Sequence, residues 1–374
     1  MTRRPGVAVL GGGVAAAAAL LTLAELDVPA CGIAPPSRAG ERDRPGESLS
    51  PKALPILAEL GLAERFAALP QRPAHATYAA WSTSFLAERN AFASPDGPGL
   101  VIDRPAFDRM LEAALEVRGV DRVAGEIVEV ERHGTGWRIA RADGAALEAD
   151  FVIDCTGARA VAARRLVQRR RADRLVAAVA FLDQIDATVE PTNATLIEAA
   201  EQGWWYATLL PDGRLALAYF TDPDFMPRNL ARDLGAWRGL VGATQFMARW
   251  IESARFALDE PPRHASAGTV WLERSAGEGW AAAGDAAAAF DPLSSHGITT
   301  ALWAGRRAAL AAAAWLGGDR VPLDAYGATL AEAVEAFLRE RTLVYGKSRF
   351  RAAPFWRRRC AVPEMSELAR ATPR

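Results

Sequence analysis

The sequence is poor in the residues that build disulfide frameworks and metal sites. Its three cysteines, Cys31, Cys155 and Cys360, lie far apart and form no C-x-x-C pair. They indicate neither a disulfide framework nor a zinc cluster, and they fit a reducing, cytoplasmic location. The four histidines form no i, i+4 pair, so we expect no metal site.

The chain also lacks an excess of charge of either sign. Its 44 Lys and Arg nearly balance 45 Asp and Glu, for a net charge of −1 at pH 7. Without a basic excess or a binding motif, nucleic acid is not an expected partner. No internal repeat or polar low-complexity tract is evident. The 374 residues suffice for one complex domain or two intergrown ones.

One apolar stretch, VAVLGGGVAAAAALLTLAEL at residues 7–26, admits two interpretations. Behind Arg3 and Arg4 it resembles a secretory signal. However, the glycines at 11–13 would interrupt an export helix, whereas a strand, a glycine turn and a helix account for the whole stretch. It is also too rich in glycine and alanine for a membrane span of about 20 strongly apolar residues. We therefore favour the strand–turn–helix and expect no membrane association.

The turn follows the pattern Gly-x-Gly-x-x-Ala, which is typical of dinucleotide-binding domains. Gly11 permits the tight turn, and Gly13 lets backbone N–H groups approach a pyrophosphate. Val14 and Ala15 then begin the helix, whose positive end would face the anion. A second strand at 28–34 completes a βαβ unit.

The remaining pattern predicts an α/β protein with an inserted antiparallel sheet. Helices are expected at 52–69, 104–118, 227–240, 242–256, 297–316 and from 323 onward. Strands are expected at 74–86, 99–103, 122–131, 137–142, 147–154, 175–182, 192–197, 204–210, 214–221, 263–273 and 279–283.

A second motif-rich stretch, GWAAAGDAAAAFDPLSSHGITTALWAGRRAA, occupies residues 279–308. A buried strand is expected to end at Gly284 and Asp285, and the Asp285 carboxylate would then accept a hydrogen bond from a polyol hydroxyl. Gly297 and Ile298 would open the next helix toward a flavin ring or a second phosphate.

The motifs occur in a characteristic order: Gly11-x-Gly13, Gly46-Glu47-Ser48, Asp103-Arg104, Asp154-Cys155-Thr156-Gly157, Gly284-Asp285, Asp291-Pro292 and Gly297. This order resembles the FAD-dependent aromatic hydroxylase superfamily, and most closely its flavin-dependent halogenase-like branch, over about residues 6–315. The resemblance implies an FAD-binding site formed by Gly11, Gly13, Val14, Ala15, Arg42, Glu47, Ser48, Arg104, Gly284, Asp285, Pro292, Gly297 and Ile298.

The resemblance also implies a domain arrangement. The FAD-binding, Rossmann-like domain is expected to comprise residues 1–73, 97–170 and 263–320. The substrate domain with the antiparallel sheet would comprise 74–96 and 171–262, followed by a helical C-terminal segment at 321–374.

The chain departs from the resembled families in two respects. The second strand ends in Ile33-Ala34-Pro35-Pro36 instead of the usual acidic residue that binds the adenosine ribose. Arg38, Arg42 or Arg44 would compensate, unless they form a solvated basic loop. Halogenases of this branch carry a lysine where this chain has Ala79, a glutamate where it has Ser294, and a Trp-x-Trp-x-Ile-Pro signature that is missing. Halogenation is therefore not expected.

We therefore predict an FAD-dependent monooxygenase that transfers oxygen from a flavin hydroperoxide, formed with molecular oxygen, to an aromatic ring. His296 and Ser295 are the candidate catalytic residues, although a histidine at a helix start is as often a structural cap. Trp204, Trp205 and Tyr206 form either an aromatic wall for a planar substrate or plain core.

Within the branch, the blocks GESLSP, DRPAFDRML, GWWYATLLPDGRL and DPLSSHGI are similar to flavoproteins that mature tryptophylquinone cofactors of the quinohemoprotein amine dehydrogenase and lysine ε-oxidase types. This similarity implies an indole substrate, a tryptophan side chain in a partner protein. NADH or NADPH is the expected electron donor. The alternatives are a flavin-dependent reductase or halogenase, or a non-enzymatic maturation factor.

Two basic stretches bear on partners, at 164–174 and 347–359. Both fit amphipathic helices with solvated faces, and the second also fits docking of an acidic protein partner.

Overall fold

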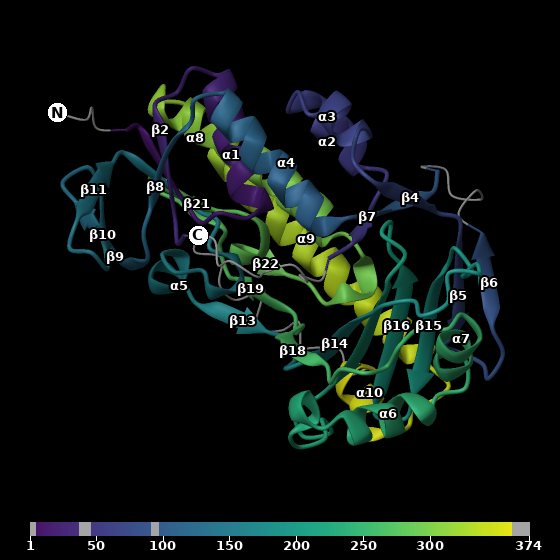
Figure 1. The fold of residues 1–374 in the computed structure, drawn as a ribbon. Coiled ribbons are helices and arrows are strands. Elements are labelled where there is room, and N and C mark those ends of the chain that lie inside the picture. The colour runs from purple at the N-terminus through teal and green to yellow at the C-terminus, as the bar shows by residue number, and fades with distance from the viewer. Residues whose placement is uncertain (1–4, 37–45, 91–96, 361–374) are drawn as a thin grey trace. The chain divides into compact units, whose positions relative to one another are not determined.

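The computed structural model describes residues 5–36, 46–90 and 97–360, and it has an α/β fold (Figure 1). The chain divides into two compact units. The first comprises residues 1–72, 99–171 and 270–334, and the second comprises 73–98, 172–269 and 335–374. The division falls within strand β4 (Gln71–Ala74) and within helix α9 (Val321–Gly346).

The first unit is built on a six-stranded sheet in the order β20-β21-β12-β1-β2-β8. Its strands are β1 (Val7–Leu10), β2 (Ala30–Ala34), β3 (Ser48–Leu49), β7 (Gly99–Ile102), β8 (Asp121–Ala124), β9 (Ile127–His133), β10 (Gly136–Arg141), β11 (Ala146–Ala149), β12 (Phe151–Asp154), β13 (Arg169–Arg171), β19 (Val270–Leu272), β20 (Ala276–Gly277), β21 (Trp280–Ala282) and β22 (Ala288–Ala289). Its helices are α1 (Val14–Glu25), α2 (Ala53–Glu59), α3 (Ala63–Ala67), α4 (Arg104–Val117), α5 (Ala163–Leu166) and α8 (Gly297–Leu316).

The six-stranded sheet is parallel except at β20, and the predicted βαβ unit is confirmed. Every residue of β1 and β12 is buried, as expected for parallel strands covered on both faces. Helices α1, α4 and α8 run side by side (Figure 1), and α1 packs against both of the others. The first and last segments of this unit therefore share one core.

Several predicted elements are interrupted in the structure, so these expected bounds were wrong; the strand expected at 74–86, for example, ends at Ala80. The helix at 52–69 divides into α2 and α3 at Gly61, whose φ is +70°. The strand at 122–131 breaks at Gly125, where a Cβ would lie 2.8 Å from Cδ of Arg141. The strand at 147–154 breaks at Asp150, because β11 belongs to the β9–β10 hairpin and β12 to the parallel sheet.

The second unit contains a seven-stranded sheet in the order β18-β14-β17-β16-β15-β5-β6. The strands are β5 (Ala76–Ala80), β6 (Ala87–Asn90), β14 (Val176–Leu182), β15 (Thr195–Ala200), β16 (Gly203–Leu209), β17 (Leu215–Thr221) and β18 (Arg263–Ser266), and the helices are α6 (Leu234–Gly242), α7 (Met247–Ser253) and α10 (Pro354–Cys360). The predicted antiparallel strands are confirmed, except that β14 pairs with β17 and β18 and not with β15. The helices α6 and α7 are shorter than the predicted 227–240 and 242–256.

Strand β16 places one tryptophan on each side of this sheet, as the alternation of side chains along a strand requires. On one side Trp205 contacts Tyr219 and Trp237, the latter in α6. On the other side Trp204 stacks on Phe220 and donates a hydrogen bond to the Tyr345 hydroxyl, with an Nε1–O distance of 3.2 Å. Both tryptophans are 1% exposed and serve the core of the sheet.

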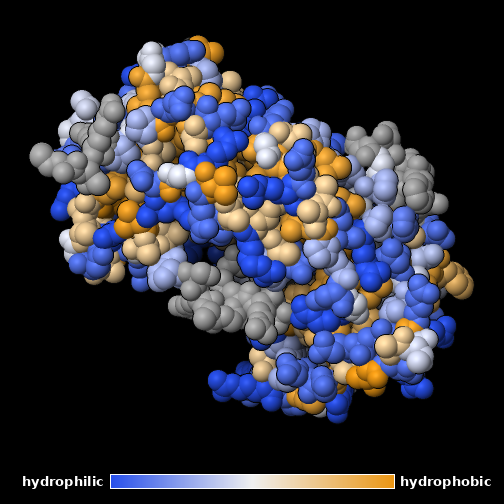
Figure 2. Space-filling model, turned by 45° about the horizontal axis from the view of Figure 1, so that its top comes forward, coloured by the Kyte–Doolittle hydropathy of each residue, from blue (hydrophilic) through white to orange (hydrophobic). Residues whose placement is uncertain are grey.

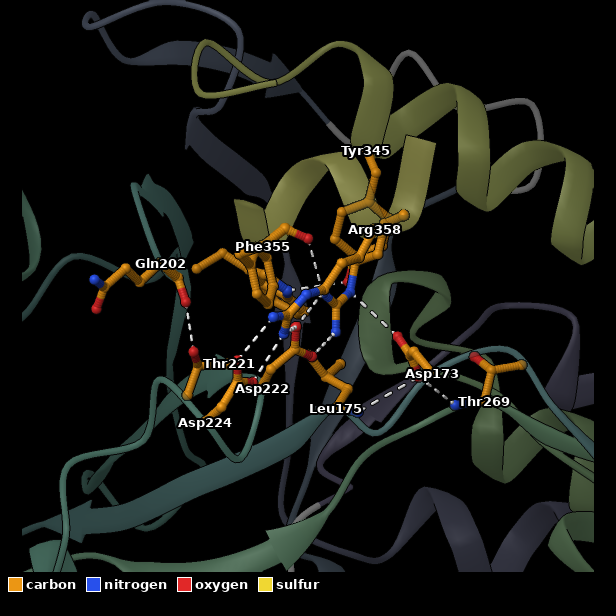
Figure 3. A network of polar contacts seen from close by, with 12 residues as sticks. Asp173, Leu175, Gln202, Thr221, Asp222, Asp224, Thr269, Tyr345, Phe355 and Arg358 are labelled. Carbon is orange, nitrogen blue, oxygen red and sulfur yellow. Dashed lines mark hydrogen bonds and ion pairs between the residues drawn. The ribbon is translucent and has the colours of Figure 1, made fainter. Parts of the chain in front are cut away.

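A network of ion pairs joins the part of the chain after residue 334 to the part that contains this sheet (Figure 3). Arg359 of α10 is fully buried, and its guanidinium contacts Asp222 at 2.5 Å and Asp173 at 3.1 Å. Arg341 of α9 also contacts Asp173, and Arg358 contacts both Asp222 and Asp224. Each buried carboxylate therefore faces two arginines.

On one face of the molecule, hydrophilic and hydrophobic residues alternate in small groups (Figure 2). The strongly exposed apolar side chains Phe85, Ile185 and Val321 lie far apart in the sequence. Among the helices of the described residues, none has the length and apolar character needed to cross a bilayer.

Candidate functional site

The predicted glycine turn follows β1 at the centre of the parallel sheet. Gly11 has φ +113°, and a Cβ there would lie 2.2 Å from the carbonyl oxygen of Cys155. Its N–H donates to the carbonyl of Ile33, at 2.7 Å. The ends of β1, β2 and β12 thus meet around this residue, and glycine is the residue that fits.

The helix after the turn begins with backbone N–H groups that receive no side-chain capping bond among the described residues. Helix α1 begins at Val14, and Gly13 at its N-cap supplies no side-chain capping bond. A Cβ at Gly13 would meet no heavy atom within 4 Å. The first N–H groups of a helix have no intrahelical acceptor. With the dipole, they form a site suited to a pyrophosphate.

Ala15 links the first motif to the second. A Cβ at Gly284 would lie 2.9 Å from Cβ of Ala15, and one at Gly305 would lie 2.1 Å from its carbonyl oxygen. Helices α1 and α8 therefore pack backbone to backbone, with Gly284 at the same contact. Sequence reasoning did not single out Gly305; its signal is a glycine within the alanine-rich face of α8.

The Gly-Glu-Ser motif and the Asp-Arg motif are also brought together. Strand β3 pairs with β7, and the N–H of Ile102 donates to the Glu47 carbonyl at 2.8 Å. Asp103 caps α4 by accepting from the Ala106 N–H at 2.8 Å. A Cβ at Gly46 would lie 2.8 Å from Nη1 of Arg104, so this glycine leaves room for the guanidinium.

Ser48 lies in β3 opposite Val101, so it is held at the same corner of the first unit. The carboxylate of Glu47 is buried and accepts from the N–H of Gly46 at 2.9 Å. The motif is therefore fixed by backbone hydrogen bonds on both sides.

Asp285 is exposed to solvent, and the pKa of its carboxyl is shifted. The residue is exposed, yet the protein around it raises the pKa of its carboxyl, and the charge of Arg104 lowers that pKa in part. The two residues from distant motifs thus act on one another. An accessible carboxylate at this point can accept hydrogen bonds from the hydroxyls of a ligand.

The segment before α8 presents a second helix start. The carboxylate of Asp291 accepts from the Leu293 N–H at 2.9 Å, and Pro292 begins a short 3₁₀ turn. Ser295 has φ +50°, and with His296 it is exposed. The side chain of Ser294 lies outside the described residues.

Helix α8 itself begins at Gly297, where a Cβ would meet no heavy atom within 4 Å. His296 occupies the N-cap but makes no side-chain capping bond, so the structure does not use it as a cap. The Thr299 hydroxyl is buried and has no hydrogen-bond partner among the described residues. The N–H groups of Gly297 and Ile298 and this hydroxyl can receive a polar ligand edge.

Asp154 has a structural role that sequence reasoning did not assign. Its buried carboxylate accepts from the N–H and hydroxyl of Thr156 and from the N–H groups of Ala162 and Ala163, at 2.6–3.0 Å. This holds the loop whose Cys155 carbonyl faces Gly11. Asp154 therefore positions the glycine turn from the neighbouring strand.

The predicted residues separate between the two units. Those proposed to hold the cofactor, and His296 with Ser295, lie in the first unit, whereas Trp204, Trp205 and Tyr206 lie in the second. The burial of the two tryptophans agrees with the plain-core alternative, and Tyr206 is half-buried. Arg42, with Arg38 and Arg44, lies outside the described residues.

No group of three or more His, Cys, Asp or Glu residues that would hold a metal ion occurs in the described ranges. The site consists instead of a glycine turn, two helix starts whose N-caps supply no side-chain capping bond, an arginine and an accessible carboxylate. These elements fit FAD, because they supply donors for its pyrophosphate and ring and an acceptor for its ribityl chain.

The fold and the site define an FAD-dependent enzyme of the oxidoreductase type. The model of the tryptophan halogenase family matches residues 71–372, and the chain belongs to this family.

Among curated relatives, LodB of Marinomonas mediterranea, described as an FAD-dependent oxidoreductase, is 26% identical over 269 residues, covering 69% of this chain and 71% of LodB. A 1H-pyrrole-2-carbonyl-[peptidyl-carrier protein] brominase of Pseudoalteromonas luteoviolacea is 25% identical over 303 residues, covering 75% of this chain and 71% of the brominase.

Among solved structures, QhpG, a peptidyl tryptophan dihydroxylase essential for tryptophylquinone cofactor biogenesis, is 25% identical with a TM-score of 0.77, covering 97% of this chain and 80% of QhpG. The myxobacterial chondrochloren halogenase CndH has the same fold, with a TM-score of 0.82 and 20% identity, covering 99% of this chain and 89% of CndH. The predicted halogenase-like branch and fold class are confirmed.

Proposed function

We propose that this chain is a monooxygenase that hydroxylates an indole-type ring, with a tryptophan side chain of a partner protein as its substrate. The similarity to QhpG over nearly the whole chain supports the substrate class. Oxygen and NADH or NADPH are the proposed co-substrates.

The observation that carries hydroxylation over halogenation is Ala79. It lies in β5, opposite Ile197 of β15, and the resemblance in sequence implies that this is the position where the halogenases carry a lysine. A methyl group neither donates a hydrogen bond nor forms a covalent bond with a hypohalous acid. Halogenation is the second candidate, because the brominase is about as similar to this chain as LodB is.

The residues of the first unit have separate tasks in this proposal. The N–H groups of Val14 and Ala15 would hold the pyrophosphate of FAD, and Asp285 would bind its ribityl hydroxyls. The N–H groups of Gly297 and Ile298 would bind polar atoms of the flavin ring. Bound FAD in its reduced form supplies the reactivity toward oxygen.

His296 stands next to that helix start and is exposed, so its imidazole is accessible as a proton donor or acceptor. Ser295, whose φ is +50°, directly precedes His296 in the chain. We assign proton transfer to His296 and orientation of the substrate to Ser295.

The first test is an anaerobic absorbance titration of the purified protein with FAD and then with NADH or NADPH. A bound-flavin spectrum is expected. The Asp285→Ala variant should lose the flavin and keep its circular dichroism spectrum; normal flavin content in this variant would contradict the site.

The second test supplies reduced FAD, oxygen and a tryptophan-containing peptide, with and without bromide. The product should gain one or two oxygen atoms by mass spectrometry in both conditions. A brominated product would instead establish the second candidate.

A further inference from the structure

Strand β13 consists of three consecutive arginines whose side chains alternate between two faces. Arg170 pairs with Glu273, with Nε 2.8 Å from the carboxylate oxygen. Because side chains alternate along a strand, Arg169 and Arg171 lie on the opposite face. Arg169 and Arg171 therefore lie on one face of the strand, and Arg170 lies on the other.

Arg169 and Arg171 have no ion pair with a carboxylate in the part of the chain that the structure describes, and the same holds for Arg164 of α5. Arg169 is half-buried, while Arg164 and Arg171 are exposed. Burial lowers the pKa of the Arg169 guanidinium, and the charges of Arg171 and Arg164 lower it further. The charges of Arg164 and Arg171 thus repel that of Arg169, and an anion beside Arg169 would relieve this repulsion.

The register of the sheet places this face close to the flavin motifs. Arg171 pairs with Val270 of β19, and Val270 pairs with Ala289 of β22. Two strand spacings, about 10 Å, therefore separate Arg171 from Ala289. Ala289 lies between Asp285 and Asp291 in the chain, and β13, β19 and β22 lie together in Figure 1.

We propose that Arg164, Arg169 and Arg171 form a binding site for the phosphate groups of a second ligand, distinct from FAD. Guanidinium groups bind phosphate oxygens through paired, charge-assisted hydrogen bonds. A nicotinamide dinucleotide carries such groups, and its reaction requires that it bind near the flavin. This assignment of the ligand rests on the proposed function; the phosphate chemistry of the site does not.

Isothermal titration of the FAD-loaded protein under anaerobic conditions tests the site with three probes: inorganic pyrophosphate, NADH and NADPH. FAD loading keeps the pyrophosphate site at α1 occupied. The Arg169→Gln/Arg171→Gln variant should bind the probes at least about tenfold more weakly, since hydrogen bonds to charged groups are lost. Arg170→Gln, on the opposite face of the same strand, is the matched control and should bind within about twofold of the unmodified protein.

The probes also distinguish the source of the phosphate. Competition between pyrophosphate and NADPH assigns the site to the dinucleotide, whereas pyrophosphate binding alone assigns it to another phosphate-bearing ligand. Equal affinities in the double variant and the unmodified protein, or no binding of any probe, would overturn the proposal. The Arg169→Lys/Arg171→Lys variant, which keeps the charge, should retain part of the affinity.

Failure of this site and failure of the proposed function give different results. Flavin content and hydroxylation with chemically reduced FAD depend on the motifs at α1 and α8, not on β13. If both remain while the double variant binds the probes normally, the phosphate site is refuted and the monooxygenase stands. If hydroxylation with reduced FAD fails in the unmodified protein, the function is refuted and the binding data still decide the site.

Discussion

Replacing Arg359 by methionine should destabilise the second unit far more than the same change at Arg358. Burial alone would lower the pKa of the Arg359 guanidinium, but its hydrogen bonds to Asp222 and the nearby carboxylates raise that pKa overall, so the group stays charged. Its guanidinium also lies 3.9 Å from the Phe355 ring centroid. Arg358 contacts the same Asp222 from a side chain that is 47% exposed.

The expected loss of unfolding free energy depends on which ion pairs remain after each substitution. Breaking a buried ion pair costs about 3–5 kcal/mol, because a buried charge loses its partner. After the loss of Arg359, Asp222 keeps Arg358 and Asp173 keeps Arg341, so we expect the lower end, about 3 kcal/mol. An exposed pair contributes about 0–1 kcal/mol, which sets the expectation for Arg358→Met.

Urea unfolding followed by tryptophan fluorescence measures this difference, because Trp81, Trp204 and Trp356 pack together in the second unit. With a slope of about 2 kcal/mol per molar urea, Arg359→Met should lower the midpoint by about 1.5 M. Arg358→Met should lower it by less than about 0.5 M. Equal shifts for the two variants would refute the reasoning, since they would show that burial of the network does not determine its contribution.

Four further substitutions test the first unit. Gly11→Ala should destabilise the protein by about 3 kcal/mol or more, since φ is +113° and the Cβ meets a carbonyl, whereas Gly13→Ala should keep the thermal unfolding midpoint and lose flavin affinity. Asp285→Asn should stabilise the flavin-free protein at neutral pH, because the raised pKa makes the ionised carboxyl unfavourable; the gain should vanish as pH falls through that pKa toward 3.8. Gly305→Ala should cost about 1–3 kcal/mol in denaturant unfolding, because its Cβ overpacks the α1 contact; an unchanged midpoint would show that the two helices can separate.

Much of the geometry of the candidate flavin site could be predicted because it lies in the backbone. The positive φ of Gly11 and Gly284 and the open helix starts at Gly13 and Gly297 are local requirements that restrict residue type at fixed spacing. Such requirements are visible in one sequence. Local geometry also identified Asp103 as the residue before a helix, and the structure shows its capping bond.

The buried ion pairs and the burial of the aromatic strand could not be predicted, because they depend on contacts between distant segments. The pairs Arg341–Asp173 and Arg359–Asp222 join residues 168 and 137 positions apart, so the basic run that contains Arg359 looked like a solvated face. Likewise, alternation along β16 predicts that its two tryptophans face opposite sides, but not that both sides are covered. Whether an aromatic strand lines a surface or a core is decided by the elements that pack on it.

The end of β2 lacks the acidic residue that dinucleotide-binding domains usually carry there. Ala34 is the last residue of that strand, its carbonyl accepts from the Gly125 N–H at 2.8 Å, and its Cβ would lie 3.0 Å from a Cβ at Gly12. Small residues thus occupy this strand end, and the residues that the structure describes there, Ile33 to Pro36, include no carboxylate to bind a ribose hydroxyl.

Introducing the acid should therefore strengthen FAD binding. Ala34→Glu supplies an acceptor for a charge-assisted hydrogen bond of about 1.5–3 kcal/mol, so the dissociation constant should fall about tenfold or more in a fluorescence titration. Ala34→Gln, which has the same shape and still carries an acceptor oxygen, separates the contribution of the charge from that of the added bulk. An unchanged constant in the glutamate variant would mean that this strand end does not meet the ribose.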